Sequence, residues 1–541
     1  MQFLDAKTRR QLDFDEVWSR IRPVSSLGKA RQRKASAFLP GESAALRQEL
    51  DRVERLSVDL GTDPRAADDL TYLLSTVRDI TGSLHRSTTG FILDDMEFYE
   101  VKKLLLTIRE IQAELGRLGW TSLLPSPLDL CTECKEALSI GQGSRDSFYI
   151  ADAYHEKLAH VRAERSRLES SLARFRTSVQ DKIMQTADRL LSMDDEITVS
   201  TTEDEMIRQL AAITELRKVQ ETAEFVKFRL VEDEGVGQIR LRLVGVRDEE
   251  EECKNQIRRQ LTEVVKCHAQ RLLSSLEQLG FLDLLLAKAR FCAEFNGTKP
   301  QLCADPIIRI KAGRHLLLEE DVKVAGHDYT PLDIQLKAGV TMITGPNMGG
   351  KTASLKTIGL LTAMAQFGLL VPAACLEFRP RRFIAAHLAA AEIPGLSAFA
   401  GEITFLCDVI KNSSQDALIL VDEIAHGTNP EEGAGIAQAI IEKLHGEPSI
   451  TVMTTHYPSL ARLEGIYHLR VKGLDKEKLG QMQVDDFQFC MDYGLEAANP
   501  DQPLMSDAVI VAEAMGLDRS IIGRTKELLK LNTSTKEGEL A

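Results

Sequence analysis

Residues 340–356 read VTMITGPNMGGKTASLK, an apolar run, a glycine-rich loop and the start of a further segment. The loop at 345–352 satisfies the pattern GxxxxGK[ST]. Val340–Thr344 predicts a strand before the loop, and apolar residues at helical spacing follow it from Leu355. Backbone N–H groups of such a loop, together with the positive end of a helix, form a cradle for phosphates. The stretch therefore predicts a nucleotide-binding P-loop in an α/β domain.

The residues of this loop have separate predicted roles. The expected nucleotide contacts are Gly345, Pro346, Asn347, Met348, Gly349, Gly350, Lys351 and Thr352. Lys351 is expected to reach the β- and γ-phosphates, and the Thr352 hydroxyl to ligate Mg²⁺. ATP and Mg²⁺ are therefore the predicted cofactors.

Two later apolar runs end in residues that suit the same chemistry. Asp422 and Glu423 follow the run 417–421, where one carboxylate is expected to hold Mg²⁺ and its neighbour to polarise the attacking water. His456 follows the run 449–454, from which an imidazole can sense the γ-phosphate. An acid pair or a lone histidine after a strand is often structural. Their order downstream of a P-loop favours a metal role for Asp422 and catalytic roles for Glu423, His456 and Lys351.

The rest of the chain divides by the period of its apolar residues. Strand and helix patterns alternate after Pro306, which predicts a parallel sheet covered on both faces. Residues 1–140 are expected to be mostly helical, with core-packing stripes. Residues 150–230 are rich in Glu, Arg, Lys, Leu and Ala, which predicts long charged helices, paired as a coiled coil. Ile239, Leu241 and Leu243 alternate with arginines, so a half-buried strand is predicted over 231–246, before helix resumes near 253.

Charge bears on the partner. The chain of 541 residues has a formal net charge of -14. Residues 231–252 hold eight acids against three arginines, and such a segment repels phosphate. A protein held on a duplex by phosphate contacts needs a concentrated basic surface. The charge opposes DNA binding except through a local patch.

Neither a membrane span nor a signal peptide is expected, because no run of about 18 apolar residues occurs and the N-terminus has no charged start before an apolar stretch. A cytoplasmic location follows as the default. The nine cysteines are scattered, which favours reduced thiols. Cys131 and Cys134 form one CxxC without a second pair, so buried thiols are favoured over a zinc or redox site.

The motifs resemble those of the MutS family, the DNA mismatch repair ATPases of the ABC superfamily. Residues 344–352 are similar to its P-loop almost letter for letter. DEIAHGT at 422–428 resembles its DEIGRGT, and TTHY at 454–457 its THY segment. Gly313–His315 precedes the loop, and stretches 14–40 and 282–291 look like lever segments of the family's second branch, which does not act in mismatch repair.

The resemblance implies a multidomain protein with an α-helical lever and clamp region followed by a C-terminal α/β P-loop ATPase domain of ABC type. The implied domains are a helical lever or core domain at 1–140, a charged, helical, clamp-like segment with a short β element at 141–260, returning lever helices at 261–304, and the ATPase domain with a helical dimerisation tail at 305–541.

A further segment implies a homodimer. GLSAF at 395–399 is similar to the family signature GxSTF, and Glu402 stands in the place of the acid that follows it. In the family this segment completes the ATP site of the opposite subunit, so the resemblance implies that Ser397 contacts the γ-phosphate in trans. Asn429–Glu431 would lie in the loop crossing the dimer interface. Tyr329 is a candidate adenine stacker, although an aromatic residue before a strand is more often core.

The chain also departs from the family pattern. A mismatch-reading domain is not expected, nor a nuclease domain after about residue 532. Ala425 and His426 replace Gly and Arg, and Ala389–Ala391 lies where an acidic pair usually precedes the signature. These changes leave the rate and control of hydrolysis open, but not ATP binding.

Two functions follow from the resemblance. The first is an ATP-gated DNA-binding protein related to mismatch repair or recombination control, in which the lever and clamp transmit the nucleotide state. The second is a protein-remodelling ATPase, because the chain also looks like short MutS-related ATPases that accompany adenosylcobalamin-dependent lysine aminomutases and are thought to reactivate them. Acidic charge favours the second function, and the frequency of DNA-binding members favours the first.

Overall fold

The computed structural model describes residues 2–142, 147–192, 194–231, 233–346, 350–388, 398–425, 428–455, 457, 460, 463, 465–474, 491–498, 509, 512 and 517–538. The chain forms two compact units. The first comprises 1–76, 118–124 and 279–541, and the second 77–117 and 125–278. The boundary near residue 278 falls inside one long helix, α11 (Glu234–Glu294). The four consecutive domains expected from the sequence stay a prediction.

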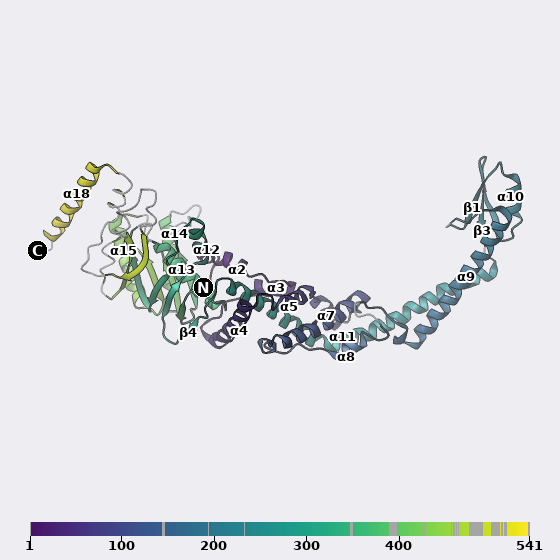
Figure 1. Ribbon diagram of the computed structural model, residues 1–541, viewed down its shortest axis with the longest axis horizontal. Coiled ribbons are helices and arrows are strands. Elements are labelled where there is room, and N and C mark those ends of the chain that lie inside the picture. Colours follow the sequence, from purple (N-terminus) through teal and green to yellow (C-terminus); the bar gives the residue numbers. More distant parts are fainter. Residues whose placement is uncertain are drawn as a thin grey trace. The chain divides into compact units, whose positions relative to one another are not determined.

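The first unit contains the predicted α/β sheet (Figure 1). Among the described residues its strands lie in the order β13 (Met491–Ala497), β12 (Tyr467–Leu474), β7 (Gly339–Thr344), β11 (Ile450–Thr454), β10 (Ala417–Val421) and β9 (Phe383–His387). The neighbours from β12 to β9 pair in parallel, and β13 is antiparallel to β12. The prediction of a parallel sheet after Pro306 is confirmed.

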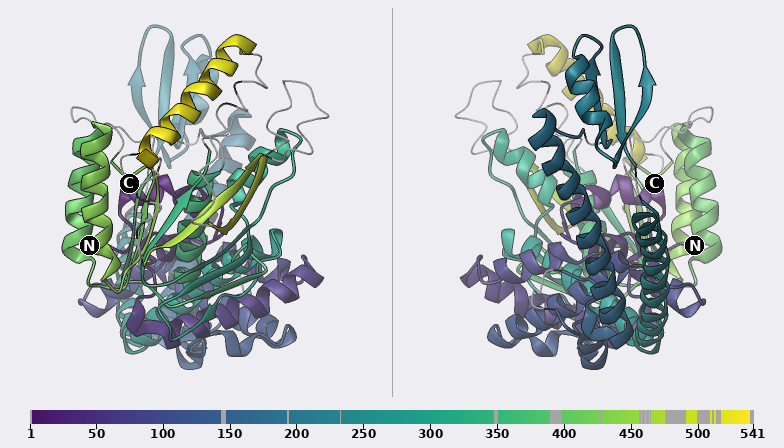
Figure 2. Two further views of the ribbon diagram at one scale, coloured as in Figure 1. Left: turned by 90° about the vertical axis from the view of Figure 1, so that its left-hand side faces the viewer. Right: turned by 90° about the vertical axis from the view of Figure 1, so that its right-hand side faces the viewer.

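Helices cover both faces of this sheet. α13 (Lys351–Gln366) lies on one face, where a Cβ added to Gly359 would come within 2.8 Å of the Leu420 side chain. Buried side chains of α14 (Ala398–Asn412) and α15 (Pro430–His445) form a core with the other face. Figure 2 shows α15, in green, beside the strands. Strands buried on both faces need apolar side chains in succession, which is why the runs at 417–421 and 450–454 do not alternate.

A smaller sheet and further helices complete this unit. Among the described residues the strand order is β4 (Gln301–Leu302), β8 (Cys375–Phe378), β5 (Ile308–Gly313) and β6 (Leu332–Leu336). The helices are α1 (Ala6–Gln11), α2 (Phe14–Ser19), α3 (Ser26–Lys34), α4 (Ser43–Thr62), α5 (Asp68–Thr76), α12 (Leu316–Val324) and α18 (Arg519–Gly538). No helix in the ranges given above is long and apolar enough to cross a membrane.

The N-terminal segment covers the edge of the large sheet. The Ile384 backbone N–H on β9 donates to the Phe3 carbonyl at 2.8 Å, and the Ala386 N–H donates to Thr8 Oγ1 at 3.2 Å. Gln11 Nε2 donates to the Leu388 carbonyl at 3.1 Å. An edge strand with unpaired backbone groups would invite pairing with other chains, and α1 removes that hazard here.

The second unit is helical with one small sheet. Its helices are α6 (Thr81–Thr88), α7 (Asp95–Arg117), α8 (Thr132–Ala137), α9 (Glu156–Ala187), α10 (Asp204–Ala211) and the first part of α11. The strands β1 (Glu196–Ser200), β2 (Leu216–Glu221) and β3 (Phe225–Leu230) pair antiparallel in the order β1-β3-β2. Apolar side chains of β1 and β3 pack against α9 and α10.

The strand predicted over 231–246 is wrong, because this stretch belongs to α11 from Glu234 onward. Val236, Leu243 and Val246 are buried at helical spacing, whereas Leu241 is 75% exposed. The strands of this region come earlier, at 196–230, where long helices were expected, so only α9 confirms that expectation. A short alternation of apolar residues and arginines fits a strand. The apolar residues that follow recur at helical spacing, however, and the stretch forms part of the long helix α11.

Three of the acids between 231 and 252 form ion pairs within the second unit: Glu249, Glu250 and Glu251. Glu250 on α11 is 2% exposed and lies 3.1 Å from Arg162 Nε and 2.5 Å from Arg165 Nη1, both on α9. Glu164 on α9 lies 2.8 Å from Arg242 Nε. Pairing between the two helices thus neutralises Glu250, whereas Arg242, one of the three arginines of the stretch, is paired with an acid from outside it.

Candidate active site

The carboxyl ends of three adjacent parallel strands bring the predicted residues together. β11 lies between β7 and β10 in the sheet. The P-loop follows β7, Asp422 and Glu423 follow β10, and Thr454 ends β11. Ligands of open α/β sheets bind at this edge. The sheet order thus joins Thr352 to Asp422 across 70 residues of sequence and Asp422 to Thr454 across 32.

Lys351 is the first residue of α13 and lies under the loop. Its side chain is 5% exposed, and Nζ donates to the carbonyls of Gly345 at 2.9 Å and Pro346 at 3.1 Å. Burial lowers the pKa of Lys351, while the charges of Glu423 and Asp422 oppose that shift. Gly350, with φ of 78°, provides the left-handed residue before the helix. The loop carbonyls therefore hold the Lys351 ammonium group through two hydrogen bonds, which contacts to a phosphate could replace.

Hydroxyl groups hold Asp422 on both sides. Thr352 Oγ1 donates to Asp422 Oδ2 at 2.5 Å, and Thr454 Oγ1 donates to Oδ1 at 2.6 Å. Asp422 is 4% exposed. A hydroxyl beside a carboxylate supplies the oxygen ligands that Mg²⁺ prefers, so these residues fit the predicted metal. No role was predicted for Thr454, although it is the first residue of the TTHY motif at 454–457.

The turn that carries Glu423 has an unusual backbone. Glu423 and Ala425 have φ of 52° and 60°, a left-handed conformation that costs an L-residue roughly 1–2 kcal/mol. The Glu423 N–H donates to Thr454 Oγ1 at 2.7 Å, and the Ile424 N–H donates to the Thr454 carbonyl at 3.1 Å. Residues in such conformations cluster at functional sites, where the surrounding structure fixes them.

Comparison with known proteins points to one family. The family model for MutS domain V matches residues 341–531. The chain is 26% identical, over 97% of its length, to a protein named endonuclease MutS2 from Bacillus velezensis. It is also 26% identical, over 99% of its length, to an endonuclease MutS2 from Geobacillus thermodenitrificans. Residues 341–531 belong to the MutS domain V family, and nearly the whole chain is similar to MutS2 proteins.

The relatives place the chain with the MutS2 branch of the family. A third relative, an endonuclease MutS2 from a Geobacillus species, is 33% identical over 322 residues, which is 58% of this chain and 38% of the relative. The chain spans 65% of the Bacillus velezensis protein and 67% of the Geobacillus thermodenitrificans protein.

Several residues assigned from the MutS motifs lie outside the described residues. They are Asn347, Met348, Gly349, Ala389–Ala391, Ser397, His426 and His456. Tyr329 is described, and its hydroxyl accepts a hydrogen bond from the His315 N–H at 3.1 Å, just before α12. Its role toward adenine stays a prediction. Asn429 caps α15 by accepting from the Glu431 N–H at 2.9 Å.

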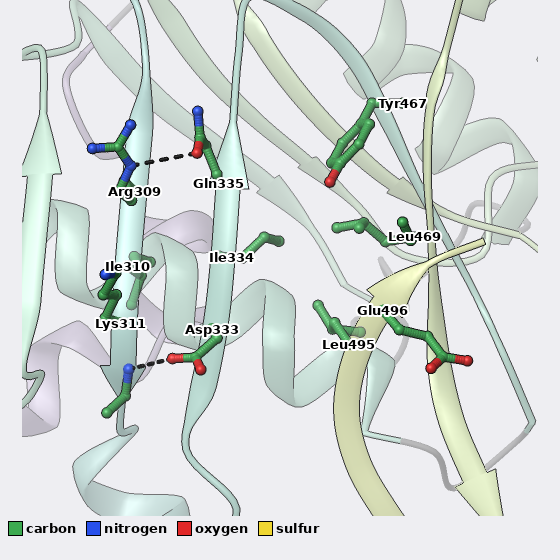
Figure 3. Close-up of a pocket in the computed structure, with 12 residues that line it drawn as sticks. Arg309, Ile310, Lys311, Asp333, Ile334, Gln335, Tyr467, Leu469, Leu495 and Glu496 are labelled. Carbon is green, nitrogen blue, oxygen red and sulfur yellow. Dashed lines mark hydrogen bonds between the residues drawn. The ribbon is translucent and has the colours of Figure 1, made fainter. Parts of the chain in front are cut away.

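A groove of about 720 Å³ lies on the same unit but away from these MutS motif residues. Residues of β5, β6, β12 and β13 line it (Figure 3). Two of its charged groups are engaged with protein partners: Arg309 Nη1 lies 2.5 Å from Glu377, and Asp333 Oδ1 accepts from the Ala312 N–H at 2.6 Å. The groove contains no part of the P-loop and neither acid of the pair, so it is not the phosphate site.

Cys131 and Cys134 are both buried at the start of α8. Desolvation raises the pKa of each thiol to about 12, with smaller effects from neighbouring groups. Metal binding and disulfide exchange both require the thiolate. Their environment therefore favours packing over the zinc or redox alternative.

Proposed function

We propose that the chain binds ATP with Mg²⁺ at the carboxyl ends of β7, β10 and β11 and hydrolyses it. The observation that carries this proposal is the cluster of Thr352, Asp422 and Thr454 beside the buried Lys351. Phosphoryl transfer needs groups that position the phosphates and stabilise their charge. The Lys351 ammonium group and the Thr352–Asp422 pair are groups of this kind.

The residues divide the work as follows. Lys351 exchanges the carbonyls of Gly345 and Pro346 for the β- and γ-phosphates when ATP enters. Thr352 and Asp422 hold Mg²⁺, which neutralises charge on the phosphates. Thr454 fixes Asp422 through its hydroxyl and fixes Glu423 through the Glu423 N–H. Glu423 then orients the water for in-line attack, and His456 senses the γ-phosphate.

The protein acts as a homodimer through its ATPase domains in this proposal. Its support is the similarity of residues 395–399 to the MutS signature, which makes Ser397 a contact to the γ-phosphate of the opposite subunit. Tyr329 is the proposed platform for adenine.

Hydrolysis of ATP is expected to require Mg²⁺ and the Thr352 hydroxyl. EDTA should abolish phosphate release, and excess Mg²⁺ should restore it. Thr352→Ala removes one oxygen ligand and one hydrogen bond to a buried carboxylate, so kcat should fall by at least about tenfold. Thr62→Ala, at an exposed threonine of α4, is the matched control. Steady-state phosphate release that persists in EDTA would contradict the proposal.

We propose that DNA is the binding partner whose contact with the protein is controlled by ATP binding and hydrolysis, as part of DNA repair or recombination. The relatives compared above carry the name endonuclease, whereas none of them is named as a protein-remodelling factor. Three of the four cations on the small sheet of the second unit are already paired: Lys218 with Glu221, and Lys227 and Arg229 both with Glu196. Few cations remain there for phosphates, so contact with a duplex should be weak.

Duplex DNA is expected to bind no more tightly than the micromolar range at physiological salt, typical of non-specific binding. Each phosphate contact should lower log K by about 0.9 per unit of log salt. Fluorescence anisotropy across a salt series, with and without ATP, measures both quantities. Nanomolar affinity gated by ATP would refute the charge argument, and no binding even at low salt would refute DNA as the partner.

A further inference from the structure

The strained turn after β10 is held at Ala425, two residues beyond Glu423. The Ala425 N–H donates to Glu402 Oε1 at 2.7 Å. The Ala425 carbonyl accepts from the Tyr457 hydroxyl at 3.0 Å. Ala425 is buried and left-handed, so its peptide would relax toward the right-handed region without such support. Two side chains from different parts of the chain thus hold the two peptides that flank Ala425.

Glu402 is an unusual residue for its position. It lies in the first part of α14 and is 3% exposed. Burying a carboxylate is costly unless it is hydrogen-bonded, and a bond from a backbone N–H to a charged oxygen is stronger than one between neutral groups. The bond to Ala425 therefore accounts for an acid inside the core that α14 forms with the sheet.

A glycine of α15, Gly433, leaves room for the hydrogen bond between Tyr457 and Ala425. A Cβ added to Gly433 would lie 2.7 Å from the Tyr457 hydroxyl oxygen and 3.1 Å from the Ala425 carbonyl oxygen. Only a residue without a side chain leaves room for this hydrogen bond. The arrangement links α14, α15 and the end of β11 at Ala425, one residue beyond Ile424 and two beyond Glu423.

We propose that Glu402 is a positioning residue for ATP hydrolysis, which acts through Ala425 to set the orientation of Glu423. The inference rests on the proposed ATPase function and deepens it. Because α14 begins directly after Ser397, the same bond transmits any displacement of α14 to the residue that orients water. Hydrolysis is then coupled to the state of α14, while ATP binding at Lys351 is not.

The test compares kcat with the affinity for a fluorescent ATP analogue in four variants of the full chain. Glu402→Ala removes a hydrogen bond to a charged group, so kcat should fall by about tenfold. Its affinity for the analogue should stay close to that of the wild type. Glu402→Gln keeps an oxygen acceptor and should recover most of the turnover. Asp408→Ala, at an exposed acid of the same helix, should behave as the wild type.

A second-site change separates positioning from folding. Glycine adopts left-handed φ as readily as right-handed φ, so Ala425→Gly in the Glu402→Ala background should raise kcat about fivefold over Glu402→Ala alone. A role of Glu402 in folding alone would give no such rescue. Wild-type kcat in Glu402→Ala, or equal loss of turnover and affinity without rescue, would overturn the inference while leaving the ATPase proposal intact. A wild-type protein without ATP hydrolysis would overturn both.

Discussion

Lys351→Ala should lose nucleotide binding and turnover together. The ammonium group lies in a water-poor loop, bonded to the Gly345 and Pro346 carbonyls, at the place where the β- and γ-phosphates are expected. Removing one preorganised donor from such an electrostatic site costs about 3 kcal/mol, or roughly a hundredfold. Isothermal titration with ATP and Mg²⁺ measures the affinity, and phosphate release measures the turnover.

Two controls sharpen this result. Lys411→Ala removes a lysine from the exposed end of α14, where its Nζ lies 3.9 Å from Asp408, and should leave binding unchanged. Lys351→Arg keeps the charge but not the compact shape of the ammonium group, so it should recover little. Wild-type affinity in Lys351→Ala would show that the nucleotide binds elsewhere.

Glu423→Gln should retain ATP and lose its hydrolysis. The change keeps the shape of the side chain and the Glu423 N–H bond to Thr454 Oγ1, but it removes the charge that polarises the attacking water. Loss of a general base typically lowers the rate by 10²–10⁴-fold, so kcat should fall by at least about a hundredfold. Single-turnover hydrolysis of radiolabelled ATP checks the chemical step directly.

The same variant tests the dimer. If ATP closes two composite sites, Glu423→Gln should accumulate as an ATP-bound dimer, detectable by sedimentation velocity with and without ATP. Glu442→Gln, at an exposed acid of α15, is the control and should turn over ATP normally. Unchanged hydrolysis in Glu423→Gln would move the catalytic role to another residue, and a monomer in saturating ATP would contradict assembly through the ATPase domains.

The sequence by itself determined the nucleotide-site motifs and the type of domain around them. The P-loop, the acid pair and the buried strands are local patterns in which spacing and residue type are fixed by short-range geometry. Resemblance of the motifs at 344–352 and 422–428 to MutS led to the family that the comparisons confirm. These features need no knowledge of which segments meet in space.

Tertiary structure alone decided the features that depend on distant partners. Alternation at 239–243 predicted a strand, but this stretch lies in α11, where Val246 is buried and Glu250 pairs with Arg162 of α9. Thr454 became part of the site because β11 lies between β7 and β10, an order that the sequence does not state. Glu402 contacts Ala425 only because α14 packs on the sheet, which the sequence does not state. Local patterns specify what a segment can form, whereas burial and hydrogen bonds between segments far apart in sequence select which form it takes and which side chains converge.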